Sequence, residues 1–376
     1  MRNKIMFISQ SNGGVARYLQ MFFKYIDKKK YKVILVYPIE YIHEKNKFEK
    51  LVDYIEFVEM HREINIIKDL KSCIAISDVI KKYDPDLIYL NSSKAGALGR
   101  IANLRYKKPI IYNPHGWAFN MKTSYLKKKV YIFIERLLSK YTDYIIAISN
   151  KEKESAIVNN IANDDKVKVI FNGIDITEYD NNLEFQKNCR LNLNISEDAI
   201  VIGMVGRISD QKAPDIFIKS AYEIKKIIPN AYFIIVGDGD KLEEIKKLIN
   251  SLGLEKDVLI TGWIDNTFNY INSFDISMLL SRWEGFGLVL AEYMVCKKPI
   301  IATNIDAIPD LIENNVNGLL IEVDSVEECV MATINIINNE VLKNNLILNS
   351  DNIVRKKFDV KRVVKEHDYL FSNLLR

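Results

Sequence analysis

The sequence of 376 residues contains only four cysteines and four histidines, and this scarcity excludes whole classes of site. Cys73, Cys189, Cys296 and Cys329 are far apart and form no CxxC pair, which argues against a disulfide framework and against a zinc ribbon. We expect them to be reduced residues of the core. No cluster of histidine, cysteine and carboxylate residues has the spacing of metal ligands.

Long apolar runs are also missing, and none reaches the length of a membrane-spanning helix. The chain passes from its start directly into a short strand, IMFIS, without a small-residue cleavage site, which predicts that the protein is not secreted. Apolar residues make up 48% and charged residues 27%, so the chain is a folded globular protein rather than a disordered one. Its length suits two domains.

Charge is distributed unevenly between the two halves. Residues 1–178 carry 31 Lys and Arg against 20 Asp and Glu, whereas residues 179–376 carry 22 against 29. The asymmetry predicts that the first half faces an anionic surface.

Short β-branched runs alternate with longer amphipathic stretches, which predicts parallel α/β architecture. The strand candidates are residues 5–9, 32–37, 53–58, 86–91, 109–113, 144–149 and 167–171, then 199–205, 231–237, 257–261, 275–280, 299–303 and 318–323. The polar, Asn-rich stretch 175–198 is the best domain junction. We therefore expect two doubly wound Rossmann-like domains, residues 1–178 and 179–357, with a C-terminal helix at about 358–376 that can pack back on the first.

In such sheets, ligands bind at the carboxyl ends of the strands. The first strand is followed by Ser11-Asn12-Gly13-Gly14, where glycines let a ligand approach the backbone and a new helix offers N–H groups to an anion. The alternative is a glycine turn that packing requires. The fifth strand is followed by Pro114-His115-Gly116-Trp117, so His115 is either a site residue or a structural one. We expect His43, His61 and His367, which lie in charged stretches, to be solvated.

In the second half, the first strand ends at Gly206-Arg207, and Lys212 follows in GRISDQKAP. Two cations at a strand end can hold a diphosphate: Arg207 can donate forked hydrogen bonds, and Lys212 can act as a point charge. The alternative is a solvated loop with incidental charge.

The motif that combines the most functional groups is EGFGLVLAE, residues 284–292, which follows the strand DISMLL. Gly285 and Gly287 interrupt the helical register, so Glu284 is expected in the loop and Glu292 on the helix. The N–H groups of residues 286–288 lie between them, and a helix dipole there favours an anion. Carboxylates for hydroxyl groups together with amides for phosphate suit a sugar nucleotide.

Two DxD sequences resemble metal-binding motifs of nucleotide-sugar enzymes, Asp84-Pro85-Asp86 and Asp238-Gly239-Asp240. The first precedes its strand, at the wrong end of the sheet, and the second lies in a turn that begins at Gly237. We interpret both as loop geometry and expect no bound metal.

With these residues in place, the chain resembles a retaining glycosyltransferase of family four with the GT-B fold, of the type that builds bacterial surface polysaccharides. The resemblance extends over nearly the whole length. It rests on Gly13-Gly14, PHGW, Ile148-Ser149-Asn150, FNGID at 171–175, GRISDQKAP, Val236-Gly237-Asp238-Gly239 and EGFGLVLAE. One departure is Asp310 in IPDLIEN, where the family more often has glutamate.

The resemblance implies a role for each matching residue. Arg207 and Lys212 would neutralise the leaving diphosphate in place of a metal ion, Glu292 would bind ribose, and His115 would contact the donor sugar near the reacting carbon. Glu284 would bind the hydroxyl groups of the donor sugar. The remaining expected donor contacts are the amides of Phe286, Gly287 and Leu288, and the glycines Gly13, Gly14 and Gly237. The GT-B fold implies that the two domains face a central cleft and that no cofactor is needed.

The expected acceptor side is the basic first half. Residues 100–140 hold ten Lys and Arg, Lys107, Lys108, Lys127, Lys128 and Lys129 among them, against the single acid Glu135, with aromatic residues interleaved. A basic aromatic helix can lie on an anionic leaflet; the alternative is a solvated basic face.

The expected partners are thus a UDP- or GDP-sugar, a lipid-linked saccharide acceptor and an anionic membrane surface, with no nucleic acid. The expected location is cytoplasmic, peripheral on the inner face of the membrane, with a role in capsule, O-antigen or exopolysaccharide synthesis. A GT-B epimerase or phosphorylase is the alternative among enzymes, and a two-lobed solute-binding protein is a more distant one. A dinucleotide oxidoreductase is disfavoured because GxGxxG is absent.

Overall fold

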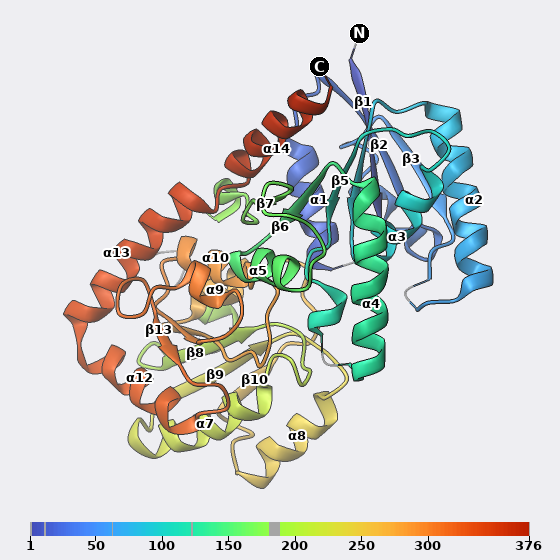
Figure 1. The fold of residues 1–376 in the computed structure, drawn as a ribbon. Coiled ribbons are helices and arrows are strands. Elements are labelled where there is room, and N and C mark those ends of the chain that lie inside the picture. The colour runs from blue at the N-terminus through green and yellow to red at the C-terminus, as the bar shows by residue number, and fades with distance from the viewer. Residues whose placement is uncertain (1, 11–12, 62, 122, 180–188, 376) are drawn as a thin grey trace. The chain divides into compact units, whose positions relative to one another are not determined.

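The computed structural model describes residues 2–10, 13–61, 63–121, 123–179 and 189–375, which form two compact units (Figure 1). Unit 1 comprises Met1–Gly173 and Val360–Arg376, and unit 2 comprises Ile174–Asp359. The chain thus leaves unit 1 five residues before the predicted boundary after residue 178. Part of the predicted junction, residues 180–188, lies outside the described residues, as do Ser11 and Asn12 of the first glycine loop.

Unit 1 is built on a parallel sheet of seven strands in the order β3-β2-β1-β4-β5-β6-β7. Ile5 of β1 pairs with Val33 on one side and with Leu87 on the other. The strands are β1 (Asn3–Ser9), β2 (Tyr31–Pro38), β3 (Tyr54–Val58), β4 (Leu87–Asn91), β5 (Ile110–Asn113), β6 (Tyr144–Ala147) and β7 (Val167–Val169). Every residue of β4 and β5 is buried, as expected of central strands covered on both faces.

Helices connect these strands in the usual crossover pattern. They are α1 (Gly14–Tyr25), α2 (Ile66–Tyr83), α3 (Ser93–Ala102), α4 (Tyr125–Leu138) and α5 (Asn150–Val158), with 3-10 turns η1 (Ile39–Lys47), η2 (Ala118–Asn120) and η3 (Ser139–Tyr141). The C-terminal helix α14 (Val360–Leu374) packs against α1 within the same unit, and α3 packs between α2 and α4.

Unit 2 has a parallel sheet of six strands in the order β10-β9-β8-β11-β12-β13. The strands are β8 (Ile200–Val205), β9 (Ala231–Val236), β10 (Val258–Ile260), β11 (Ile276–Leu279), β12 (Ile300–Thr303) and β13 (Leu319–Ile321). The helices are α7 (Pro214–Ile227), α8 (Leu242–Ser251), α9 (Phe268–Ser273), α10 (Leu288–Val295), α11 (Ile308–Leu311), α12 (Val326–Asn338) and α13 (Glu340–Lys357), preceded by the 3-10 turn η4 (Ile176–Tyr179).

Local sequence signals explain where several of these helices begin and end. Pro214 opens α7, a position where its missing N–H costs nothing. The Ser325 side chain accepts a hydrogen bond from the N–H of Glu328 and so caps α12. Gly253, with φ of +68°, follows α8 in the left-handed region that glycine tolerates. All thirteen predicted strands are confirmed, each within a few residues of its predicted bounds.

The four cysteines are buried and form no disulfide among the described residues, in agreement with the sequence-based expectation. Over the part of the chain that the structure describes, we find no helix that combines the length and the apolar character needed to span a membrane.

Candidate active site

Each of the two sheets has one point where the strand order reverses. In unit 2, this point locates the candidate site. In unit 2, β8 lies between β9 and β11, so the loops that follow β8 and β11 leave the sheet side by side in opposite directions. Ligands of open α/β sheets bind at such a switch point. Both predicted unit 2 motifs, GRISDQKAP and EGFGLVLAE, begin there.

Lys212 and Glu284 meet at this switch point. The Nζ atom of Lys212 donates a hydrogen bond to Oε2 of Glu284, and these side chains are 16% and 9% exposed. The Ser281 hydroxyl donates to the same carboxylate oxygen over 3.2 Å. An ion pair with so little exposure is weakly screened by water, so Lys212 is not an incidental surface charge. The structure therefore joins the cation of one motif to the carboxylate of the other.

The loop that carries Glu284 is fixed by neighbouring loops. The backbone N–H of Glu284 donates to Oδ2 of Asp306 over 2.9 Å, and the amide of Gln211 donates to the carbonyl of Trp283 over 3.0 Å. The buried Thr303 hydroxyl donates to the Ser281 carbonyl over 2.6 Å. Side chains after β12 and β8 thus hold the Glu284 loop in place.

Two glycines let the ends of β8 and β9 lie directly against each other. A Cβ atom added to Gly237 would lie 2.0 Å from the carbonyl oxygen of Gly206, and one added to Gly239 would lie 2.3 Å from that of Ile208. The backbone N–H of Gly206 donates to the Val236 carbonyl over 3.0 Å. Gly237 is therefore required by packing beneath the site, and its expected donor contact remains a prediction.

Arg207 follows Gly206 and is exposed. Among the residues that the structure describes, its guanidinium group has no ion-pair partner within 4.0 Å. The two predicted phosphate-binding cations thus differ: Lys212 is paired and largely buried, and Arg207 is available to an anion from solvent.

Helix α10 begins where the sequence predicts. Gly287, with φ of +79°, precedes its first residue Leu288, so Glu284 lies in the loop and Glu292 on the helix. The first N–H groups of a helix have no acceptor within it, and this end of the helix favours an anion. Glu292 is 5% exposed and accepts a hydrogen bond from the Thr267 hydroxyl over 3.3 Å.

Phe286 and Tyr293 anchor this region to the core of unit 2. The ring of Phe286 packs edge-on against Phe358 with 5.9 Å between centroids. The backbone N–H of Val205, the last residue of β8, donates to the Tyr293 hydroxyl over 2.8 Å, and burial raises the pKa of that hydroxyl far above its usual range. The site is therefore built on rigid elements.

In unit 1 the corresponding switch point lies between β1 and β4. Gly13, with φ of +68°, is the N-cap of α1, and Gly14 is its first residue. A Cβ atom added at either position would meet no atom within 4 Å. Space for a side chain therefore does not require glycine at either position, whereas the positive φ of Gly13 favours glycine in the turn; a role of the pair in ligand binding stays a prediction.

His115 lies after β5 in a conformation that few residues other than glycine adopt, with φ of +53°. Its Nε2 atom lies 3.0 Å from Oδ1 of Asn91, and its backbone N–H donates to Oδ1 of Asn113 over 2.9 Å. Burial, followed by the nearby His367, lowers the pKa of the His115 imidazole to about 3, so the ring is neutral at physiological pH. A neutral imidazole offers one donor and one acceptor.

The same loop is held from α5 by Glu152. Its carboxylate accepts hydrogen bonds from the N–H groups of Gly116 and Ile148 over 2.7 and 2.5 Å, and Ser149 caps the helix. Burial raises the Glu152 pKa to about 7. The segment Ile148–Asn150, noted in the sequence, thus supports the histidine loop.

The five predicted basic residues of unit 1 are arranged on two elements. Lys107 and Lys108 follow α3, where Lys108 forms a 2.7 Å ion pair with Asp84. Lys127, Lys128 and Lys129 are exposed on the first turn of α4.

Expectations for the other histidines hold in two of three cases. His43 is exposed, and His61 lies 2.7 Å from the Glu59 carboxylate at the surface. His367 was expected to be solvated, and this is wrong: it is 1% exposed on the inner side of α14. The charged residues around it in the sequence occupy the other faces of the helix, a distinction that composition alone does not make.

The DxD sequences have local partners. Asp84 caps α2 with φ of +44°, and Asp86 accepts the Lys4 N–H over 2.7 Å. Asp238 accepts the N–H of Gly239 over 2.7 Å. Among the described residues, no three His, Cys, Asp or Glu side chains gather as a metal site would require.

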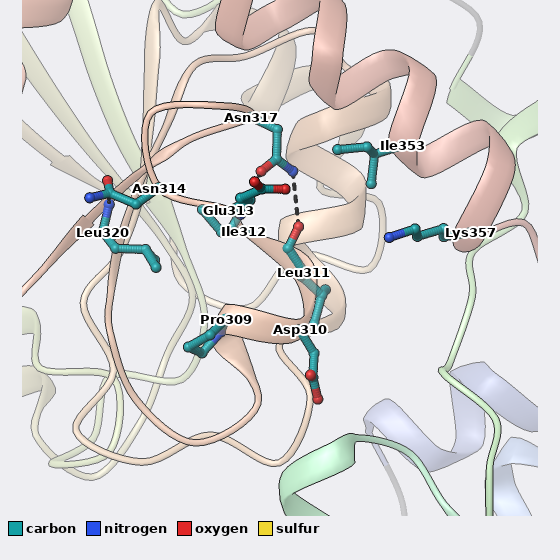
Figure 2. Close-up of a pocket in the computed structure, with 10 residues that line it drawn as sticks. All are labelled: Pro309, Asp310, Leu311, Ile312, Glu313, Asn314, Asn317, Leu320, Ile353 and Lys357. Atoms are coloured by element: carbon teal, nitrogen blue, oxygen red, sulfur yellow. Dashed lines mark hydrogen bonds between the residues drawn. The ribbon is translucent and has the colours of Figure 1, made fainter.

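Unit 2 has a hollow of about 410 Å³ beside α11 and α13. Figure 2 shows the residues that line it. Asp310, the departure from the family pattern, lines it, and the Asn317 amide donates to the Leu311 carbonyl at its edge over 2.9 Å. Lys357 reaches it from α13. No predicted donor-binding residue lines this hollow, so it is separate from the Lys212–Glu284 site.

Several supporting residues were not predicted from the sequence. They are Asn91, Asn113, Thr267, Ser281, Glu152 and Asp306. The buried strands β4 and β5 end at the polar residues Asn91 and Asn113. A polar residue at the carboxyl end of a buried strand is a signal that could have identified them. Ser281 contacts Glu284 three residues along the chain, and Ser149 with Glu152 has the spacing of a helix capping box, so these two also carry local signals. Thr267 and Asp306 act through tertiary contacts that carry no local signature.

Comparison with known proteins identifies the family. Residues 12–178 match the model described as Glycosyltransferase Family 4, and residues 185–352 match Glycosyl transferases group 1. The chain is 32% identical to UDP-Gal:alpha-D-GlcNAc-diphosphoundecaprenol alpha-1,3-galactosyltransferase of Escherichia coli, over 80% of each chain. It is 27% identical to the capsular polysaccharide biosynthesis glycosyltransferase CapM of Staphylococcus aureus, over 85% of each chain.

The fold agrees with this assignment. The crystal structure of HepE from Anabaena in complex with UDP superposes with a TM-score of 0.86 at 24% identity, covering 98% of this chain and 100% of that one. Each unit has the doubly wound parallel sheet that the sequence predicts. The chain therefore belongs to glycosyltransferase family 4 and has the GT-B fold.

Proposed function

We propose that the protein transfers a sugar, with retention at the anomeric carbon, from a UDP- or GDP-sugar to a lipid-linked saccharide during surface-polysaccharide synthesis. The observation that carries this proposal is the Lys212–Glu284 pair at the β8/β11 switch point, beside the exposed Arg207. The named donor of the Escherichia coli relative is UDP-Gal, and HepE was crystallised with UDP, which favours UDP over GDP.

The reaction requires charge to separate. The bond between the anomeric carbon and the phosphate oxygen breaks, and a new bond forms from the acceptor oxygen to the same carbon. The proton of the acceptor hydroxyl goes to the leaving diphosphate. Because negative charge grows on the diphosphate in the transition state, cations fixed beside it lower the barrier.

The roles of the unit 2 residues follow from this charge. Arg207 and Lys212 bind the diphosphate, and Glu284, which holds Lys212 before the donor arrives, accepts hydrogen bonds from the hydroxyl groups of the sugar. The amides of Phe286, Gly287 and Leu288 contribute dipoles, and Glu292 binds the ribose. Because Lys212, Glu284 and the start of α10 are held in place by their neighbours, little reorganisation of these groups accompanies the reaction.

Unit 1 supplies the acceptor side in this proposal. His115 contacts the donor sugar, and Gly13 and Gly14 allow the first loop to approach phosphate. The acceptor named for the Escherichia coli relative is a saccharide on diphosphoundecaprenol. We therefore propose a peripheral location on the inner face of the membrane.

The exposed surface of α4 supports membrane contact. Leu126, Val130, Phe133 and Leu137 are spaced by four, three and four residues and are 75%, 49%, 66% and 49% exposed, so they form an apolar stripe along one face. Lysines of the first turn flank it. Exposed apolar residues bordered by cations are typical of a helix that lies in an anionic bilayer interface.

Helix α2 has a second stripe of the same kind. Ile66, Ile67, Leu70 and Ile74 are all more than half exposed, and Lys68 and Lys71 lie among them. Helix α3 packs against both α2 and α4, so the two helices that carry the stripes lie in one layer of unit 1. We assign this surface to the bilayer that holds the acceptor.

The donor proposal is tested by thermal stabilisation with UDP-sugars and GDP-sugars. A bound donor at a hundred times its Kd adds about 2.7 kcal/mol to the stability of the protein. We expect stabilisation by a UDP-sugar, unchanged after treatment with EDTA because no metal is required. Variant Lys212→Met should lose the shift, and Lys246→Met on α8 should keep it. No shift with any nucleotide sugar would contradict the proposal, and a shift that needs manganese would contradict its metal independence.

A further inference from the structure

The buried His367 belongs to a hydrogen-bond network that leads to His115. His367 lies on α14, and its ring packs against Phe22 of α1 with 5.1 Å between centroids. Every member of the network lies in unit 1. The catalytic proposal above makes no use of His367, and a buried histidine with three polar contacts, to Val363, Tyr89 and Tyr18, requires an explanation.

The tautomer of His367 follows from its partners. Its Nδ1 atom lies 2.8 Å from the carbonyl oxygen of Val363, which can only accept, so Nδ1 carries the hydrogen. Burial lowers the His367 pKa to about 4, so the ring is neutral and Nε2 must accept. The Tyr89 hydroxyl, 2.8 Å away, is the donor.

The direction of the hydrogen bond from Tyr89 to His367 also sets the orientation of the Asn113 amide. The oxygen of the Tyr89 hydroxyl accepts a hydrogen bond from Nδ2 of Asn113 over 3.3 Å. Oδ1 of the same amide therefore faces the backbone N–H of His115, 2.9 Å away. This contact holds His115 in its left-handed conformation, which would otherwise cost of the order of 1 kcal/mol or more.

The His115 ring is oriented from β4. Nδ2 of Asn91 donates to the Tyr89 carbonyl over 3.3 Å, so Oδ1 of Asn91 faces Nε2 of His115. Nε2 must then carry the hydrogen, and Nδ1 of His115 is the acceptor. Tyr18 closes the network: its hydroxyl lies 3.3 Å from that of Tyr89, and its ring packs edge-on against His115 at 4.8 Å.

We infer that His367 is a positioning residue for the transfer reaction: through Tyr89 and Asn113, it fixes the loop conformation that places His115. This inference rests on the proposed function, which assigns His115 to the donor sugar. It gives α14, the last helix of the chain, a role in catalysis besides its packing.

The test compares two substitutions of His367. His367→Phe fills the space but removes the acceptor for Tyr89, so we expect kcat to fall about tenfold, the effect of one lost hydrogen bond, with both KM values within about twofold. His367→Gln restores an acceptor and should recover most of kcat. The exposed His43→Phe is the matched control and should behave as the original protein.

Two further measurements separate positioning from simple structural damage. Tyr89→Phe removes the same link between His367 and Asn113. The double variant, Tyr89→Phe with His367→Phe, should therefore lose no more kcat than either single variant loses. The ¹⁵N chemical shift of the His115 backbone amide, which donates to Asn113, should change in His367→Phe and return toward its original value in His367→Gln.

An unchanged kcat in His367→Phe, or losses that add in the double variant, would overturn the inference. A different result would overturn the proposed function: if His115→Ala transfers sugar at the original rate, His115 has no role in the reaction, whatever its tautomer. The ¹⁵N measurement does not depend on activity, so the two failures are distinguishable.

Discussion

At the residue scale, Arg207 and Lys212 have the same sign and the same proposed ligand but different surroundings. Arg207 is exposed at the end of β8, whereas Lys212 is paired with Glu284 and largely buried. Removing an exposed cation has little effect on folding, whereas removing one partner of a buried pair leaves the other charge poorly solvated. The two cations should thus give different signatures when mutated.

We expect Arg207→Ala to lower kcat/KM at least about a hundredfold, because the transition-state charge loses a donor, while Tm stays within about 1 °C. Lys212→Ala should lower kcat/KM similarly and also reduce stability by about 1 kcal/mol or more, since Glu284 loses its partner. Initial-rate kinetics and differential scanning calorimetry measure both effects. An active Arg207→Ala enzyme would contradict the diphosphate assignment.

The sequence predicted the charged residues of this site but not the groups that hold them. Lys212, Glu284 and Glu292 were identifiable because short motifs after strands carry them. Asp306, which holds the Glu284 loop, lies 22 residues further along the chain, and only the pairing of β11 with β12 brings it near. His367 was misjudged for the same reason, since burial on one face of a helix depends on what packs there.

At the scale of elements, a buried ion pair fixes α4 to the sheet. Nη2 of Arg100 on α3 donates to Oε2 of Glu135 on α4 over 2.8 Å, and the Tyr112 hydroxyl of β5 donates to Oε1 over 2.8 Å. The guanidinium group also lies over the Tyr112 ring, 4.2 Å from its centroid. Glu135 was noted in the sequence only as the one acid in a basic stretch.

We expect Glu135→Ala to destabilise the protein by about 3–5 kcal/mol, because the fully buried Arg100 would lose its counter-charge. Replacing both charges, as in Arg100→Met with Glu135→Leu, should cost far less because neither charge is then left unpaired. Guanidinium chloride unfolding measures both. If the double variant is as unstable as Glu135→Ala, the pair does not act as a unit.

The exposed face of α4 gives the next prediction. Replacing Lys127, Lys128 and Lys129 with glutamate should release the protein from vesicles containing anionic lipid, at about 1 kcal/mol for each cation near the surface. Leu126→Ser with Phe133→Ser should weaken binding to the same vesicles even at high salt, because apolar insertion is not screened.

Vesicle sedimentation measures both variants of α4. The matched control reverses three exposed lysines of unit 2, Lys246, Lys247 and Lys256. This control should sediment as the original protein does. Equal binding by the α4 variants and the control would contradict the membrane assignment.

At the scale of the whole molecule, the two units differ in how they should respond to acid. All four histidines lie in unit 1, and burial lowers the pKa of His115 to about 3 and of His367 to about 4. The strand patterns of the sequence were sufficient to predict two domains, and a count of charged residues was sufficient to show that its two halves have opposite net charge. The lowered pKa values of the partly buried His115 and the buried His367 depend on packing, so this consequence required the structure.

We expect unit 1 to lose stability first as the pH falls from 6.5 to 5. The unfolded chain binds a proton at His115 and at His367 near pH 6.5, whereas the folded chain binds neither until about pH 4 or below, so each of these two sites costs about 1.4 kcal/mol per pH unit. Glu152, with its pKa raised to about 7, offsets part of this loss, because the folded chain takes up its proton at higher pH than the unfolded chain does. As the pH falls, the stability lost through His115 and His367 together exceeds the stability gained through Glu152.

Hydrogen exchange followed by mass spectrometry resolves the two units. Amide protection in β1, β4 and β5 should fall between pH 6.5 and 5, while that in β8 and β11 changes little. His367→Phe keeps Glu152 and His115, so its stability should depend on pH about 1.4 kcal/mol per unit less steeply than that of the original protein. Equal loss of protection in both units, or an unchanged slope in His367→Phe, would mean that the buried histidines do not govern stability in acid.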